Sequence, residues 1–172
     1  MGGVPHLILV GLPGAGKTTV GAALAVRLGW PFLDLDERIE AQTGMRIPEI
    51  FAKQGEGAFR ELERAATMEL AESPTQSVVA PGGGWIAVPG LVELVRPPSK
   101  LIFLQVAPTT AFRRLAASVA DRPLLAGADP LAALNGLLAE RQAFYLQADH
   151  TLSVDSMTPD EVASAILTLA GP

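Results

Sequence analysis

Residues 11–18 read GLPGAGKT and match the pattern G-x-x-x-x-G-K-[ST] at every fixed position. This is the phosphate-binding loop (P-loop) that opens a helix in many nucleotide-binding proteins. Its glycines let backbone N–H groups turn toward phosphate oxygens, and the helix adds the positive end of its dipole. An apolar stretch at Leu7–Val10 precedes the loop and a helical pattern from Lys17 follows it. The pattern therefore predicts a nucleotide site rather than a chance glycine-rich turn.

Three side chains of this loop suit a bound triphosphate. Lys17 is expected to reach the β and γ phosphates, Thr18 to offer its hydroxyl to Mg²⁺, and Thr19 to contact the α phosphate. The residues of the loop that are predicted to bind the nucleotide are Gly14, Ala15, Gly16, Lys17, Thr18 and Thr19. A guanine-reading N-K-x-D motif does not occur, and the chain is short for a motor or switch protein. Among GTPases, ATPases and small-molecule kinases, the sequence favours a kinase.

Two carboxylates follow the second apolar stretch, in the sequence FLDLDE at Phe32–Glu37. A strand over Phe32–Asp36 would place Asp34 and Asp36 on the same face. Asp34 could then hold Mg²⁺ through water, and Asp36 could orient or deprotonate a substrate hydroxyl. The alternatives are a solvated strand end, or Asp36 as the N-cap of a helix over residues 37–42.

Three arginines stand where they could grip anionic groups. Arg60 and Glu63 are three positions apart in a helical stretch, so Glu63 could position Arg60; an exposed ion pair of little energetic weight is the alternative. Arg122 lies in ASVADRPLLAG, which indicates a loop that could act as a lid over a transferring phosphate. Arg141 lies in the middle of a predicted helix and could bind a carboxylate. Taken singly, an arginine in such a position is more often a solvated residue.

Three adjacent glycines, Gly82, Gly83 and Gly84, follow Pro81 in the sequence VVAPGGGW. Ordering glycine costs more backbone entropy than ordering any other residue. Either this loop is a flexible turn, or something approaches its backbone so closely that a Cβ would be in the way. The second interpretation predicts a wall of bare backbone against a substrate.

Apolar stretches alternate with helical patterns along the chain, which is typical of a parallel sheet covered by helices on both faces. The expected strands are Leu7–Val10, Phe32–Asp36, Ser77–Ala80, Leu101–Val106 and Thr151–Val154. The expected helices are Lys17–Leu28, short helices to about Ala71 with stops at Gly44 and Gly55, Val88–Val95, about Pro108–Ala117, Asp129-Pro130 to about Gln147, and a last helix opened by the capping box Thr158–Glu161. Such sheets bind ligands beyond the carboxyl ends of their strands, where the residues above fall.

Length, charge and composition restrict the function classes. The 172 residues are enough for one domain, and no apolar run approaches the ~20 residues that span a bilayer. The N-terminus lacks the basic region of a signal peptide, so we expect no membrane association. A net charge of −5 without a basic stripe argues against nucleic-acid binding. The sequence has no cysteine, which excludes disulfides and fits a reducing cytoplasm.

Together these motifs resemble those of the shikimate kinase family, which belongs to the P-loop kinases. The resemblance covers about Leu7 to Leu169 and is carried by GLPGAGKTT, FLDLDERIE, IPEIFAKQGEGAFRELE, PGGGW, DRPLL and ERQAFY. It implies a three-layer α/β fold with a five-stranded parallel sheet in the order 2-3-1-4-5, flanked by helices. It also implies one domain over 1–172, a mobile lid at about 115–128 and a substrate-binding region at about 34–64.

The activity implied by the resemblance is transfer of the γ-phosphate of ATP to the 3-hydroxyl of shikimate, with Mg²⁺, on the pathway to chorismate and the aromatic amino acids. The implied catalytic residues are Lys17, Asp36 and Arg122, with Arg122 on the transferring phosphate. Shikimate would bind Asp36, Arg60, Gly82, Gly83, Gly84 and Arg141. Arg60 and Arg141, the two clamp arginines, would bind its carboxylate, and Glu63 would support Arg60. Thr18 and Asp34 would serve Mg²⁺, and Arg114 and the loop at Pro159 would enclose adenine. A cytoplasmic monomer is expected.

The chain departs from the family pattern at Pro81, where a small or hydroxylated residue is common, and at Met157-Thr158, where some relatives have a basic residue. The segment Arg114–Arg122 is also slightly longer than in relatives. Two other functions stay open at this point. One is a kinase of another small polyol acid such as gluconate, and the other is a shikimate-kinase-like sensor module that binds a ligand without turnover.

Overall fold

The computed structural model describes residues 5–116 and 127–171. Five parallel strands form one sheet in the order β2-β3-β1-β4-β5, which confirms the predicted topology. The strands are β1 (Leu7–Val10), β2 (Phe32–Asp34), β3 (Val78–Ala80), β4 (Lys100–Gln105) and β5 (His150–Ser153). All residues of β1 and β3 are buried, as is typical of central strands covered on both faces.

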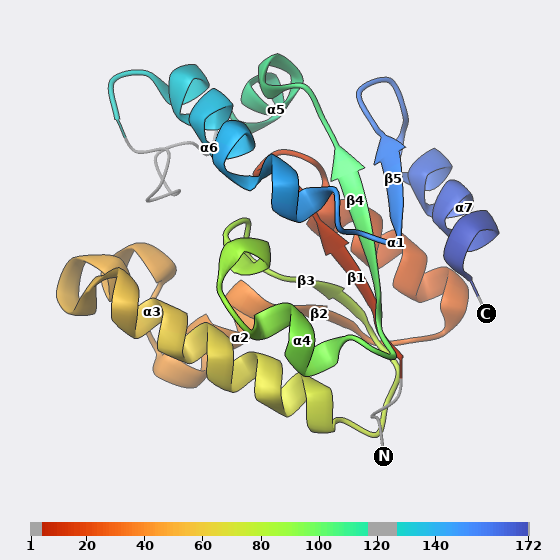
Figure 1. Cartoon of the computed structure of the whole chain (residues 1–172), viewed down its shortest axis with the longest axis horizontal. Helices are drawn as coiled ribbons and strands as arrows, with labels where there is room; N and C mark the ends of the chain where they lie inside the picture. The colour runs from red at the N-terminus through yellow and green to blue at the C-terminus, as the bar shows by residue number, and fades with distance from the viewer. Residues whose placement is uncertain (1–4, 117–126, 172) are drawn as a thin grey trace.

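Helices cover both faces of the sheet (Figure 1). They are α1 (Lys17–Leu28), α2 (Leu35–Thr43), α3 (Ile47–Glu72), α4 (Leu91–Val95), α5 (Pro108–Leu115), α6 (Pro130–Tyr145) and α7 (Pro159–Ala170), with a 3₁₀ turn η1 at Trp85–Ala87. On one face α1 packs against α7, and on the other α3 packs against α4. In the described part of the chain, no helix is long and apolar enough to cross a membrane.

The predicted helix caps at the C-terminal half of the chain are confirmed. Asp129 accepts a hydrogen bond from the N–H of Ala132 at the start of α6. Thr158 and Glu161 form a reciprocal capping box at the start of α7. Because each cap satisfies N–H groups that a helix start leaves unpaired, these short polar signals fix where the helices begin.

The expected strand over Phe32–Asp36 is wrong by two residues. β2 ends at Asp34, whose carboxylate accepts a 3.1 Å hydrogen bond from the N–H of Glu37 and caps α2. Asp36 therefore lies in the first turn of this helix and is not its N-cap. An N-cap carboxylate accepts a hydrogen bond from the N–H three residues later. Asp34 does so with Glu37, and this places the start of α2 directly after Asp34.

Smaller differences concern element ends. Gly55 has φ of 85° and interrupts α3, so the predicted stop is present as a kink within one longer element. A 3₁₀ turn follows the glycines, and α4 begins at Leu91 rather than at Val88. The other helices and strands end within about two residues of the prediction. Most of the predicted lid, residues 117–126, lies outside the described residues.

Candidate active site

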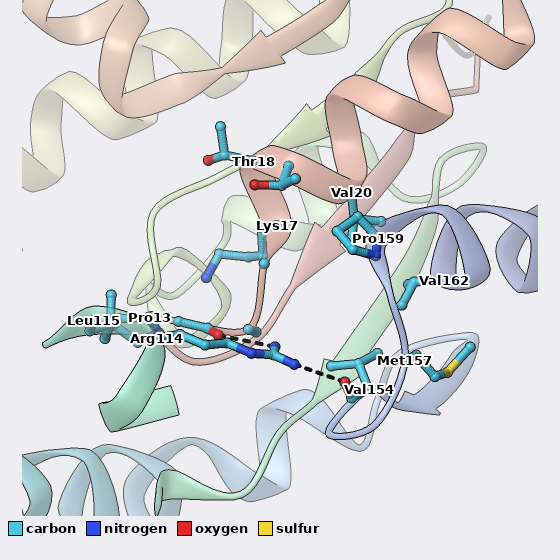
Figure 2. A pocket seen from close by; sticks show the side chains of 14 residues that line it. Pro13, Lys17, Thr18, Val20, Arg114, Leu115, Val154, Met157, Pro159 and Val162 are labelled. Atoms are coloured by element: carbon cyan, nitrogen blue, oxygen red, sulfur yellow. Dashed lines mark hydrogen bonds between the residues drawn. The ribbon is translucent and has the colours of Figure 1, made fainter. Parts of the chain in front are cut away.

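A cavity of about 450 Å³ opens beside the P-loop, between the start of α1, the end of α5 and the loop from β5 to α7 (Figure 2). Its walls come from distant parts of the chain. They are formed by Pro13, Gly14, Ala15, Gly16, Lys17, Thr18, Thr19, Val20, Arg114, Leu115, Val154, Met157, Pro159 and Val162. All the nucleotide-binding residues predicted within the described part of the chain line this one cavity.

Backbone geometry explains why the P-loop needs glycine. Gly14 has φ of 86°, and a Cβ there would lie 2.6 Å from the carbonyl oxygen of Ala111 in α5. Any other residue would be strained and would push α5 away from the loop. Beyond the loop, the Lys17 ammonium donates hydrogen bonds to the carbonyls of Gly11 at 2.7 Å and Leu12 at 3.0 Å. The cation therefore lies over the loop, where phosphate oxygens could replace the carbonyls as its acceptors.

Thr18 and Asp34 meet at the edge of the cavity. The Thr18 hydroxyl donates a 3.1 Å hydrogen bond to Oδ2 of Asp34, while Oδ1 of Asp34 caps α2. One hydroxyl and one carboxylate suit Mg²⁺, which is held by few protein ligands and takes the rest from water and phosphate. The described residues contain no cluster of three or more His, Cys, Asp or Glu that could hold a metal ion by itself.

The opposite wall of the cavity is built by Arg114 and by the loop after β5. The Arg114 guanidinium donates to the carbonyl of Val154 at 3.1 Å and to that of Gly14 at 3.4 Å (Figure 2). Pro159 and Met157 add apolar surface to this wall. The sequence predicted Arg114 and Pro159 for this wall, gave Val154 no role in it, and drew attention to Met157 only as a departure from the family pattern. Val154 directly follows β5 and Met157 lies in the same loop, so their place at the carboxyl edge of the sheet is the signal that predicts a role for both.

A second cavity of about 410 Å³ lies between α3, α6 and the loop after β3. It is lined by Glu56, Arg60, Gly84, Ala87, Val88, Pro89, Glu140, Arg141 and Phe144. The two arginines that were predicted to share one ligand, Arg60 and Arg141, thus line one cavity although they come from different helices.

Arg60 is held by a buried carboxylate. Its Nη1 lies 2.5 Å from Oε1 of Glu63, whose side chain is only 1% exposed. Burial raises the pKa of the Glu63 carboxyl, and the attraction of Arg60 opposes that shift. The pair is therefore not the exposed i,i+3 contact that was the alternative interpretation. A guanidinium with one edge fixed by a buried acid presents its other edge in a defined direction.

The three adjacent glycines lie against the charged groups of this region. A Cβ on Gly82 would lie 2.9 Å from Oδ1 of Asp36, one on Gly83 3.1 Å from Nη1 of Arg141, and one on Gly84 2.7 Å from Nη2 of Arg60. None of the three has positive φ, so the backbone conformation does not require glycine. The close approach of neighbouring side chains requires glycine instead. The approaching groups in the structure are an aspartate and two guanidinium groups.

The loop formed by Gly82, Gly83 and Gly84, called the glycine loop below, also lies next to the P-loop. A Cβ on Gly83 would lie 3.4 Å from Cδ of Pro13, which lines the first cavity. Asp36, Arg60 and Arg141 therefore surround a loop that borders the nucleotide-side cavity. The structure brings these residues together, and their binding roles stay predictions. Arg122 lies outside the described residues.

Two buried polar atoms in this region lack hydrogen-bond partners among the described residues. They are Oε2 of Glu63 and Nη1 of Arg141, and Arg141 is only 5% exposed. Leaving a buried charged group unsatisfied is costly, so such atoms mark places where a ligand or water would be stabilised.

Three aromatic and hydroxyl side chains support the loop, and the sequence suggested no role for them. The Tyr145 hydroxyl donates to the carbonyl of Gly83 at 3.4 Å. The indole N–H of Trp85 donates to the Thr67 hydroxyl at 2.9 Å, which in turn donates to the carbonyl of Glu63 at 2.7 Å. Tyr145 and Trp85 are fully buried. Both aromatic residues occur in quoted motifs, but only the fold shows what they touch.

Comparisons with known proteins show the family of the chain. A family model described as shikimate kinase matches residues 13–170. A shikimate kinase of Synechococcus sp. (strain RCC307) is 44% identical over 94% of this chain and 82% of its own length. One of Moorella thermoacetica (strain ATCC 39073 / JCM 9320) is 41% identical over 94% of this chain and 91% of its own length. The solved structure of shikimate kinase from Acinetobacter baumannii in complex with shikimate has a TM-score of 0.91 at 36% identity, covering 96% of this chain and 92% of that chain.

Proposed function

The chain belongs to the shikimate kinase family, and from that premise we propose which of its residues carry an ATP-dependent phosphotransfer to the 3-hydroxyl of shikimate. One observation supports the assignment most directly. Arg60, Arg141 and Asp36 surround the glycine loop, and that loop borders the P-loop at Pro13. A small molecule with one carboxylate and several hydroxyls could contact all three side chains beside a bound triphosphate.

On the nucleotide side, ATP occupies the cavity at the P-loop. The loop N–H groups, Lys17 and Thr19 bind the phosphates, and Arg114 and Pro159 enclose the adenine. Thr18 and Asp34 would hold Mg²⁺, which would neutralise phosphate charge when bound. Arg122, named by the sequence alone, contacts the transferring phosphate from the lid. Most of the acceleration then comes from positioning and from fixed positive charge.

On the acceptor side, Arg60 and Arg141 bind the carboxylate of shikimate, and Glu63 keeps Arg60 oriented. Asp36 accepts a hydrogen bond from the reacting hydroxyl and aligns its oxygen with the γ phosphorus. The hydroxyl oxygen forms a bond to that phosphorus while the bond to the β–γ bridging oxygen breaks, so ADP leaves and the hydroxyl proton is released. Gly82, Gly83 and Gly84 let these charged side chains approach the backbone. We also propose a cytoplasmic monomer, by analogy with the family.

A coupled assay of ADP release with ATP, Mg²⁺ and shikimate tests this function, with gluconate as a parallel substrate. We expect release that depends on shikimate and not on gluconate. Lys17→Ala should lower turnover by orders of magnitude, while Lys53→Ala, which removes an exposed lysine of α3, should leave it unchanged. Turnover of gluconate alone would point to the other kinase, and shikimate binding without ADP release would point to a sensor module.

A further inference from the structure

Arg60 contacts two carboxylates that differ in burial. Glu63 binds Nη1 and is 1% exposed, whereas Glu56 reaches Nη2 at 3.2 Å and is 61% exposed. The first carboxylate is fixed inside the protein. The second is free to move into water, because an exposed i,i+4 ion pair is only weakly favourable.

Glu56 stands at the cavity and not on an unrelated surface. It lines the same cavity as Arg60 and Arg141. It follows directly after Gly55, where φ of 85° interrupts α3. Its carboxylate therefore occupies the edge of the Arg60 guanidinium that Glu63 leaves available.

Arg141 differs from Arg60 in this respect. Among the described residues, no acidic side chain lies within ion-pair distance of Arg141, and its buried Nη1 has no hydrogen-bond partner. The cavity thus contains one buried guanidinium that has no ion pair among the described residues and one whose outer edge is covered by an acid. A carboxylate that engages both arginines has to replace Glu56.

We propose that Glu56 is a displaceable substitute for the carboxylate of the substrate. In the empty site it neutralises Arg60, and it leaves when a ligand carboxylate takes its place. This inference rests on the proposed function, because it assumes that a carboxylated substrate binds Arg60. Its consequence is that Glu56 competes with the substrate and weakens binding of ligands that carry the carboxylate, but not of ligands that lack it.

The test is titration calorimetry of shikimate and of its uncharged methyl ester, in the presence of ADP, with wild type, Glu56→Gln and Glu61→Gln. Glu61 is exposed on the same helix and has no ion pair among the described contacts, so Glu61→Gln makes the same change in net charge away from the cavity. We expect Glu56→Gln to lower the Kd of shikimate about two- to fivefold, the range of an exposed ion pair. The Kd of the methyl ester should not change, and Glu61→Gln should behave as wild type.

An unchanged or raised Kd of shikimate in Glu56→Gln would overturn the inference, and so would equal tightening of the ester. Turnover of shikimate by the wild type, measured as ADP release, tests the proposed function separately. If wild type phosphorylates shikimate while Glu56→Gln binds it no better, the inference alone fails. If binding responds to Glu56→Gln as expected but no phosphate is transferred, the proposed function alone fails. Absence of shikimate binding to wild type would overturn both.

Discussion

The Tyr145 hydroxyl lies 3.4 Å from the carbonyl oxygen of Gly83 and joins the last turn of α6 to a loop 62 positions earlier. Arg141 precedes Tyr145 by one helical turn, and its guanidinium lies near enough to the same hydroxyl to influence its pKa. Burial raises the pKa of Tyr145, and Arg141 opposes that shift. One phenol thus links the clamp arginine to the glycine loop, while its ring stacks on Phe103 of β4 at 4.6 Å.

We predict that Tyr145→Phe raises the KM of shikimate and leaves the KM of ATP unchanged. The variant keeps the ring and its stacking but loses the hydroxyl that donates to the Gly83 carbonyl and lies beside Arg141. One hydrogen bond contributes about 1 kcal/mol, so we expect about a fivefold increase. Steady-state kinetics with each substrate varied in turn would measure it. Equal changes in both KM values would indicate a general loss of structure instead.

Gly84→Ala should weaken shikimate binding with little loss of stability. The new methyl group would lie 2.7 Å from Nη2 of Arg60 and 3.2 Å from Nη2 of Arg141, so both guanidinium groups would have to move. They are ends of flexible side chains and φ is not positive, so the fold should tolerate the change. We expect the KM of shikimate to rise tenfold or more, roughly the loss of one good charged hydrogen bond.

Gly136→Ala is the matched control for that variant. Gly136 lies within α6, and a Cβ there would meet nothing within 4 Å. Alanine should therefore leave both KM values unchanged and stabilise the protein by roughly 0.5–1 kcal/mol in denaturant unfolding. If Gly84→Ala also left the kinetics unchanged, the close approach of the arginines would have no functional weight.

The alternation of strands and helices and the P-loop could be predicted from the sequence because each rests on local patterns, whereas the order of the strands in the sheet was implied only by the family resemblance. Leu7–Val10 is apolar throughout and leads directly into GLPGAGKT, so strand, loop and helix are encoded together. The end of β2 could not be predicted in the same way. Asp34 and Asp36 are both good caps, and only the hydrogen bond to the N–H of Glu37 distinguishes them.

The contacts between distant residues were not readable from the sequence. The glycine triplet indicated close approach, but nothing local identified Asp36, Arg60 and Arg141 as the approaching groups. The surroundings of Glu63 also depend on Trp85, whose indole N–H donates to Thr67 of α3, one helical turn after Glu63. Such long-range relationships arise from tertiary packing, which propensity and spacing do not contain.

The loop from β5 to α7 should depend on Asp155. Its Oδ1 accepts a 3.0 Å hydrogen bond from the N–H of Ala107 before α5, and this bond lowers the pKa of Asp155. The neighbouring Val154 carbonyl accepts from Arg114. Asp155→Ala should therefore raise the KM of ATP several-fold, about the effect of one hydrogen bond, without changing the KM of shikimate. Asp155→Asn keeps the acceptor and should recover most of the loss; if it did not, the charge and not the hydrogen bond would be responsible.

Asp34→Asn should raise the Mg²⁺ concentration needed for half-maximal activity, by about tenfold, because a neutral amide is a poorer ligand for Mg²⁺ than a carboxylate. The fold should not suffer. Asparagine is as good an N-cap as aspartate, and α2 needs only an acceptor for the N–H of Glu37. Activity titrated with Mg²⁺ at saturating ATP would measure the shift, and thermal unfolding without Mg²⁺ would check the cap. An unchanged Mg²⁺ requirement would remove Asp34 from the metal site.

His6 should make the stability depend on pH. Its side chain is buried, Nε2 lies 3.1 Å from the carbonyl of Leu70, and Nδ1 has no hydrogen-bond partner among the described residues. Burial lowers the pKa of His6, although the Leu70 carbonyl opposes that shift. Above the usual histidine pKa both folded and unfolded states are neutral, so no stability is lost. As the pH falls below about 6.5, His6 binds a proton in the unfolded state but not yet in the folded state, where its pKa is lower. The free energy of unfolding therefore decreases.

Denaturant unfolding at several pH values between 7.5 and 5.5 measures this loss, which is at most about 1.4 kcal/mol per pH unit for one proton. Glu63, whose pKa is raised, changes stability in the opposite direction, so the comparison has to be between variants. His6→Gln keeps a donor for the Leu70 carbonyl and should flatten the decline. His150→Gln, which replaces the other of the two histidines, should keep it. A decline that vanished in His150→Gln and persisted in His6→Gln would show that the buried imidazole is not its source.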